Sequence, residues 1–152
     1  MTDTPTDLIE VHAETTATPQ EVMEVLEDGW LYALWVVGAS HIRDVDPGWP
    51  KAGTKIHHAV GVWPFLLRDD TESKSYDPAG SLELVARGWP VGAAFVRIEV
   101  NGTESGSRIT LGERVIAGPG KAVRPLEPLL VRPRNREALH RLVALAEGRR
   151  HT

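Results

Sequence analysis

Two polar side chains fall in phase with apolar neighbours on expected strands, and both could perform acid–base chemistry. His58 alternates with Ile56, and Glu113 alternates with Leu111. This alternation predicts that each faces the buried side of its strand. Imidazole exchanges protons near neutral pH, and a buried carboxylate needs a partner. We interpret His58 and Glu113 as candidate catalytic residues. The alternative is a core histidine held by one hydrogen bond and a strand-end glutamate that reaches solvent or the rim beside Arg114.

No metal or cofactor is expected. His57 and His58 are adjacent on one strand, so they point to opposite faces and cannot bind one ion together. His41, His58 and Glu113 could be drawn as a two-histidine, one-carboxylate site, but their spacing matches no short metal motif. The sequence also lacks GxGxxG, Walker, GxSxG and HExxH patterns, which argues against nucleotide enzymes, serine hydrolases of that type and zinc proteases.

Aromatic residues suggest a possible ligand pocket. Trp-Pro occurs three times, at 49–50, 63–64 and 89–90, where proline favours strand ends at which a tryptophan covers the rim of the core. The alternative is an aromatic collar around a pocket mouth, with Trp30, Tyr32 and Trp35 as its helical side. The residues expected to contact a ligand are Trp30, Tyr32, Trp35, Ile56, His58, Val60, Trp63, Leu84, Trp89, Val96, Ile98, Leu111, Glu113, Leu139 and Leu142.

The elements that position these residues begin with a strand over 7–16. Thr18 then predicts a helix start, with Glu21 completing a capping box, and Gly29 predicts its end. The apolar run 30–37 predicts a second short helix.

Six further strands are expected, at 40–45, 54–62, 65–76, 81–88, 93–100 and 107–116. Asn101-Gly102 indicates a hairpin whose loop extends to Gly106. The tail predicts a helix that begins between 124 and 134 and ends near 147. Pro133 either starts this helix or kinks it.

This order predicts an α+β fold. Consecutive strands joined by short turns pair antiparallel, and a sheet of six to seven twisted strands curls. The apolar stripe of the C-terminal helix is expected to lie across the concave face. A helix cannot touch a curved sheet everywhere, so we expect a pocket, placed beneath Leu139 and Leu142. Residues 1–152 are read as one domain, with 1–6 extended or disordered and 148–152 frayed.

Composition limits the function classes. The 152 residues are 41% hydrophobic, include no cysteine and carry a formal net charge of −4. A nucleic-acid binder is not expected, because such proteins cluster Lys and Arg. The arginines of the tail are interpreted as a solvated face, and the alternative is a site for an anionic partner or a membrane surface. No apolar run approaches the length of a membrane span, and residues 1–7 lack a signal-peptide pattern, so we expect no stable membrane insertion and a cytoplasmic location. We also expect a monomer or homodimer.

The chain resembles the START-like, or SRPBCC, superfamily, and within it the polyketide cyclase/dehydrase-type members. The residues that carry this resemblance are 9–11, 17–22, 53–58, 61–64 and 135–139. The resemblance implies a helix-grip fold with a cavity for lipids, polyketides, sterols, hormones or other apolar molecules. It implies no catalytic residues, because the superfamily has no universal catalytic motif.

Three functions follow from these observations. The first is binding or carriage of a small hydrophobic ligand. The second is an aromatase/cyclase or dehydratase in which His58 and Glu113 serve enolisation and aldol-type ring closure. The third is a protein-interaction module with a residual pocket. Fold alone does not decide among them.

Overall fold

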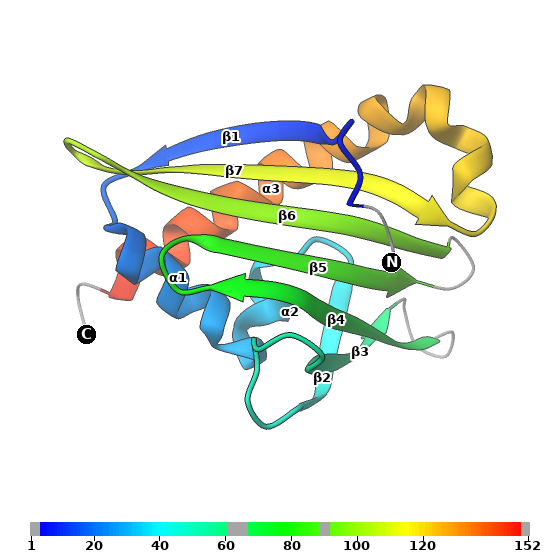
Figure 1. Cartoon of the computed structure of the whole chain (residues 1–152), viewed down its shortest axis with the longest axis horizontal. Helices are drawn as coiled ribbons and strands as arrows, with labels where there is room; N and C mark the ends of the chain where they lie inside the picture. Colours follow the sequence, from blue (N-terminus) through cyan, green and yellow to red (C-terminus); the bar gives the residue numbers. More distant parts are fainter. Residues whose placement is uncertain (1–3, 61–66, 89–91, 150–152) are drawn as a thin grey trace.

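The fold is a seven-stranded antiparallel sheet crossed on one face by a long C-terminal helix (Figure 1). The computed structural model describes residues 4–60, 67–88 and 92–149. The strands are β1 (Ile9–Thr15), β2 (Ala39–Val45), β3 (Lys55–Val60), β4 (Leu67–Asp77), β5 (Ser81–Gly88), β6 (Gly92–Thr103) and β7 (Gly106–Ala117). The helices are α1 (Pro19–Glu27), α2 (Tyr32–Trp35) and α3 (Glu127–Gly148), with 3₁₀ segments η1 (Gly29–Leu31) and η2 (Pro119–Leu126).

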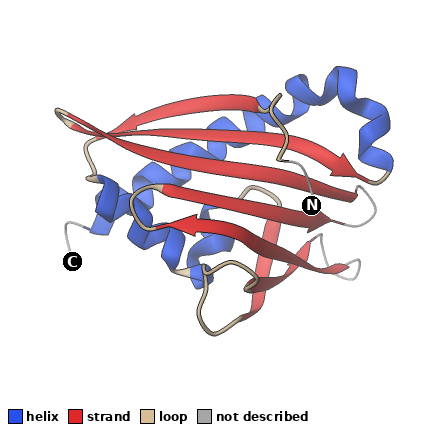
Figure 2. Ribbon diagram, viewed as in Figure 1, coloured by secondary structure: helices blue, strands red, loops and turns tan. Residues whose placement is uncertain are grey.

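The strand order is β1-β7-β6-β5-β4-β3-β2, so β1 and β2 lie at opposite edges. The helices α1 and α2 carry the chain from one edge to the other (Figure 2). Every pairing is antiparallel, and β2 crosses at a steep angle to β6 and β7 (Figure 1). The predicted α+β helix-grip arrangement is therefore confirmed.

The helix start at Thr18 is confirmed in atomic detail. The Thr18 hydroxyl accepts a hydrogen bond from the Glu21 amide at 3.2 Å, and the Glu21 carboxylate accepts one from the Thr18 amide at 3.4 Å. The single helix predicted over 30–37 is wrong. Asp28 ends α1, and its carboxylate then accepts a hydrogen bond from the Trp30 amide at 3.1 Å. This cap starts η1, and the helical segment then changes from 3₁₀ to α at Tyr32 without a further cap, so it consists of η1 and the one-turn helix α2, which ends at Trp35.

The hairpin between β6 and β7 lies further along than the Asn101-Gly102 signal indicates. Strand pairing continues to Thr103 and Gly106, which leaves Glu104 and Ser105 as the turn. Asn101 and Gly102 lie inside β6. Continuous cross-strand pairing has overridden the local turn preference here.

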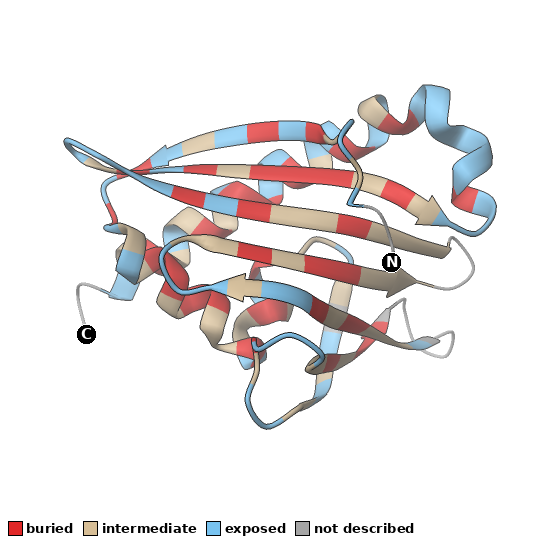
Figure 3. Ribbon diagram, in the orientation of Figure 1, coloured by how far each residue is buried: buried red, intermediate tan, exposed pale blue. Residues whose placement is uncertain are grey.

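Helix α3 begins at Glu127, and Pro133 lies inside it rather than at its start. Its C-terminal half packs tightly, since Leu139 and Leu142 are 1% and 0% exposed. Both belong to the main apolar core, where they join residues of α1 and the central strands (Figure 3). The pocket predicted beneath these two leucines is therefore wrong in position. Among the described residues, no helix is long and apolar enough to cross a membrane.

Candidate functional site

A cavity of about 360 Å³ lies under the N-terminal half of α3. Its floor comes from β3, β5, β6 and β7, and its sides come from α2, the α2–β2 connection and η2. Most of the wall is apolar. The apolar residues that line it are Val36, Val37, Ala39, Ala86, Ala93, Ala94, Val115, Val123, Leu130 and Val131. A smaller hollow of about 70 Å³ adjoins it and shares Tyr32, Ala86 and Glu113 with it.

The cavity exists because the inward-facing side chains of the sheet are small at this end. Leu82 pairs with Ile98 in the filled half of the sheet, and both are buried. Ala86 pairs with Ala94 four residues further along, so two methyl groups replace two large side chains. Protein interiors are otherwise close-packed, so this substitution of small for large leaves space under α3.

A hydrogen-bonded chain of three side chains supplies one polar part of the wall. The Thr71 hydroxyl is 0% exposed and shares a hydrogen bond of 2.9 Å with the Tyr32 hydroxyl and one of 3.0 Å with His58 Nε2. The Tyr32 and His58 rings also stack, with centroids 5.8 Å apart. Tyr32 and His58 both line the cavity. Thr71 does not line it and bonds to both of these side chains. His58 Nδ1 is buried and makes no hydrogen bond within the described part of the chain.

Burial sets the protonation of Tyr32 and His58 in this hydrogen-bonded group. It raises the pKa of the Tyr32 hydroxyl to about 12, so the phenol stays neutral. Burial also lowers the pKa of His58, although Asp69 and Asp70 act in the opposite direction. A neutral imidazole bonded through Nε2 presents Nδ1 as either one donor or one acceptor.

Acid should therefore weaken the fold through His58. In the unfolded chain this imidazole takes up a proton as the pH falls below 6.5, whereas the folded protein resists protonation to lower pH. Its stabilising contribution is complete above that pH and is lost as the pH falls toward the lowered pKa. We expect the melting temperature of wild type to fall more than that of His58→Gln between neutral pH and mildly acidic pH. Parallel pH profiles would show that His58 does not resist protonation.

Glu113 supplies a second polar part of the wall, and its partners come from α3. The carboxylate is 5% exposed in a strand of apolar neighbours. It accepts a short hydrogen bond from Arg134 Nη2 and one of 2.9 Å from Asn135 Nδ2. The expectation that Glu113 faces inward is correct, and the strand-end alternative is wrong. Sequence reasoning missed Arg134 and Asn135, because it assigned the tail arginines to a solvated face.

Glu127 fixes the entrance of the cavity. Its buried carboxylate accepts hydrogen bonds from the Val115 amide at 2.7 Å and from Arg114 Nη1 at 2.9 Å. These bonds fasten the first turn of α3 to β7. Glu113 and Glu127 thus hold the roof of the cavity at two points, so the space is part of the folded architecture.

Comparisons with known proteins identify the fold. No family model matches the chain, and no curated protein sequence matches it. A solved structure of the protein of unknown function SA2116 from Staphylococcus aureus has a TM-score of 0.74 at 12% identity, covering 96% of each chain. Ara h 8.0201 has a TM-score of 0.65 at 10% identity, covering 93% of this chain and 98% of that one.

DynU16, a protein in the dynemicin biosynthetic locus, has a TM-score of 0.61 at 21% identity. The match covers 94% of this chain, which spans 48% of DynU16. The chain has the START-like, or SRPBCC, helix-grip fold. In this helix-grip fold the cavity occupies the space between the gripping sheet and the helix.

The helix-grip cavity gathers only some of the residues expected to contact a ligand. Tyr32, His58 and Glu113 line the main cavity. Four others line the adjoining hollow: Trp35, Leu84, Val96 and Leu111. Four are packed in the core and line neither space: Ile56, Ile98, Leu139 and Leu142. Trp63, Trp89 and the side chain of Val60 lie outside the described residues.

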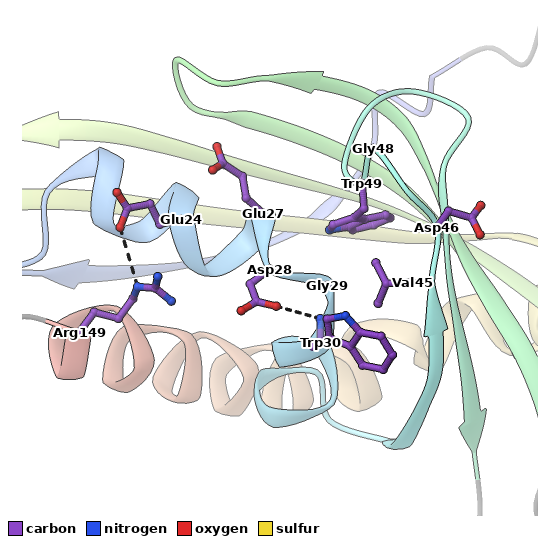
Figure 4. Close-up of a pocket in the computed structure, with 10 residues that line it drawn as sticks. All are labelled: Glu24, Glu27, Asp28, Gly29, Trp30, Val45, Asp46, Gly48, Trp49 and Arg149. Carbon is purple, nitrogen blue, oxygen red and sulfur yellow. Dashed lines mark hydrogen bonds and ion pairs between the residues drawn. The ribbon is translucent and has the colours of Figure 1, made fainter. Parts of the chain in front are cut away.

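Trp30 lies elsewhere, so the predicted helical side of the collar reduces to Tyr32 and Trp35. Trp30 is 57% exposed and borders a different groove of about 480 Å³ (Figure 4). His41 is exposed, whereas His58 and Glu113 are buried, so these three residues do not form the two-histidine, one-carboxylate site considered from the sequence. No group of three or more candidate metal ligands occurs in the part of the chain that the structure describes.

The groove beside Trp30 is larger than the cavity but polar, and its acidic residues already have structural partners. Asp28 caps η1, and Glu24 forms an ion pair with Arg149 at 3.8 Å (Figure 4). Glu27 accepts a short hydrogen bond from the Tyr76 hydroxyl, and Asp46 binds His57 Nε2 at 2.8 Å. These bonds give the charges a structural explanation, so we place the candidate site in the apolar cavity.

Proposed function

We propose that this protein binds a small, largely apolar molecule in the cavity under the N-terminal half of α3. The supporting observation is a space of about 360 Å³ whose walls are mostly apolar and whose polar lining includes Tyr32 with His58 and Glu113 with Arg134. Pockets for small molecules typically measure ~300–1,000 Å³ and combine apolar walls with few polar groups. Such a wall selects a flat or branched hydrocarbon skeleton that carries a polar substituent.

The polar groups suggest where the ligand is oriented. The Tyr32–Thr71–His58 chain places the Tyr32 and His58 rings in the wall, and His58 Nδ1 has no partner among the described residues but is buried, so a ligand would bond to it only after a shift of the wall. Arg134 also lines the cavity, from α3, and its 40% exposed side chain has donors beyond the one bonded to Glu113. A ligand with a hydroxyl or carbonyl at one end and an acidic or carbonyl oxygen at the other would satisfy both groups.

Native mass spectrometry of the freshly purified protein tests this proposal. We expect a population heavier than the polypeptide by one small organic molecule, which denaturation releases for identification. If the protein is purified without a ligand, addition of 8-anilinonaphthalene-1-sulfonate should produce a one-to-one complex. Absence of both complexes would contradict the proposed function.

An acid–base enzyme is the second candidate, and the convergence of His58, Tyr32 and Glu113 on one cavity favours it. His58 is the better base, because Glu113 is already engaged by Arg134 and Asn135. An assay with a β-hydroxy ketone would test this activity, because loss of water from this substrate gives an enone whose formation is measured by its absorbance. We expect His58→Gln to abolish such turnover if it occurs; turnover that survives this substitution would exclude His58 as the base.

A further inference from the structure

An apolar ridge is exposed at the mouth of the cavity. It consists of Val123, Leu126, Leu129 and Leu130, which are 43%, 55%, 73% and 64% exposed. These residues belong to η2 and the first turns of α3, which project beyond the ends of the strands as an exposed hook (Figure 3). Contiguous exposed apolar side chains on a folded protein mark interaction sites. We call this feature the leucine ridge.

The leucine ridge is held outward by the fold. Glu127 and Val131 face the protein, because Glu127 bonds to β7 and Val131 is 6% exposed and lines the cavity. Leu129 lies between them on the helix and points toward solvent, whereas Leu130 lies at the border, 64% exposed but also lining the cavity. The exposure is thus built into the same contacts that form the cavity entrance.

Positive charge is gathered on the same segment. Residues 121–136 contain five basic side chains, namely Lys121, Arg124, Arg132, Arg134 and Arg136. The only acidic residue among them is Glu127, which is buried and paired with Arg114. The whole chain has a net charge of −4, so this basic segment contrasts with the rest of the protein. Lys121, Arg132 and Arg136 are exposed on the same segment as the leucines.

We propose that the leucine ridge docks on a membrane surface that contains anionic phospholipids. Exposed leucines gain free energy when they enter the interfacial region of a bilayer, and nearby basic side chains are attracted by anionic headgroups. Val123 and Leu130 belong both to the ridge and to the cavity wall. Docking therefore turns the cavity entrance toward the lipid. The proposal rests on the ridge and its charge and does not require any particular cavity ligand.

A single fluorophore tests the docking. The chain contains no cysteine, so Leu129→Cys gives one labelling site for an environment-sensitive dye. The matched control is Leu34→Cys on α2, where the natural side chain is 55% exposed. With vesicles of phosphatidylcholine and phosphatidylglycerol, we expect a blue shift and a brighter signal at 129 but not at 34. Phosphatidylcholine vesicles alone should give a much smaller change.

Charge substitutions provide an independent measurement on the unlabelled protein. Vesicle co-sedimentation of Arg132→Gln/Arg136→Gln should weaken by about fivefold for each arginine removed, and added salt should weaken wild type similarly. The control is Arg141→Gln on the C-terminal half of α3, which should bind as wild type does.

Three results would overturn the proposal: equal dye responses at 129 and 34, no co-sedimentation with anionic vesicles, or binding insensitive to both arginines and salt. A dye response that rises with protein concentration without vesicles would instead assign the ridge to a second copy of the chain. Binding of an acidic polypeptide without any vesicle binding would assign it to a protein partner.

Discussion

Replacing Ala94 with phenylalanine should abolish ligand binding while leaving the protein folded. Ala94 lies opposite Ala86 in the sheet, and both line the cavity. A benzyl group at 94 would project into existing space, so the usual penalty of overpacking a filled core does not apply. We expect affinity for 8-anilinonaphthalene-1-sulfonate to fall by about tenfold or more, and the melting temperature to stay level or rise, because the added ring buries apolar surface.

The matched control for this substitution is Ala117→Phe. Ala117 also lies in the sheet, at the end of β7, but its side chain is exposed. This variant should bind the dye as wild type does. If Ala94→Phe binds normally, the dye does not occupy the cavity. If Ala94→Phe unfolds, the space at this end of the sheet is smaller than we describe.

Replacing Thr71 with valine should strongly destabilise the fold. Valine keeps the shape of threonine but removes the hydroxyl that bonds both Tyr32 and His58. Two buried polar groups would then lack their partner, and each such loss costs ~1–3 kcal/mol. We expect a loss of roughly 2–4 kcal/mol in the free energy of unfolding, measured by urea denaturation, and a melting temperature lower by roughly 10 °C.

Thr71→Ser is the control, because it keeps the hydroxyl and removes only one methyl group. It should retain most of the stability, and the contrast with valine isolates the hydrogen bonds. Equal losses in the two variants would assign the effect to packing of the methyl group. A stable Thr71→Val protein would mean that Tyr32 and His58 find other partners.

The sequence was informative wherever a local rule has one physical outcome. Thr18 and Glu21 are three residues apart, which is the spacing that a capping box requires, and the box is present. Alternation correctly placed His58 and Glu113 on the inner face of the sheet, because side-chain direction in a strand has period two. The order of strands and helices predicted the α+β arrangement, because consecutive strands joined by short turns pair antiparallel.

The sequence was uninformative wherever the outcome depends on what lies across the core. Period two shows that Glu113 faces inward, but only the docking of α3 decides that Arg134 meets it. The apolar stripe of α3 predicted burial at Leu139 and Leu142, yet it could not show which half of the helix lacks a filled sheet beneath it. The usable signal was the pair of inward alanines, Ala86 and Ala94, which marks where the sheet surface recedes.

Methyl-resolved NMR of the protein titrated with 8-anilinonaphthalene-1-sulfonate tests the central claim most directly. Methyl groups of Val36, Val115 and Val131 line the cavity, whereas those of Val22 and Leu142 are buried in the core away from it. We expect the first three to shift together and saturably with one equivalent of dye, while the other two stay in place. Shifts centred on Val45 in the groove beside Trp30, or none at the cavity valines, would contradict this account.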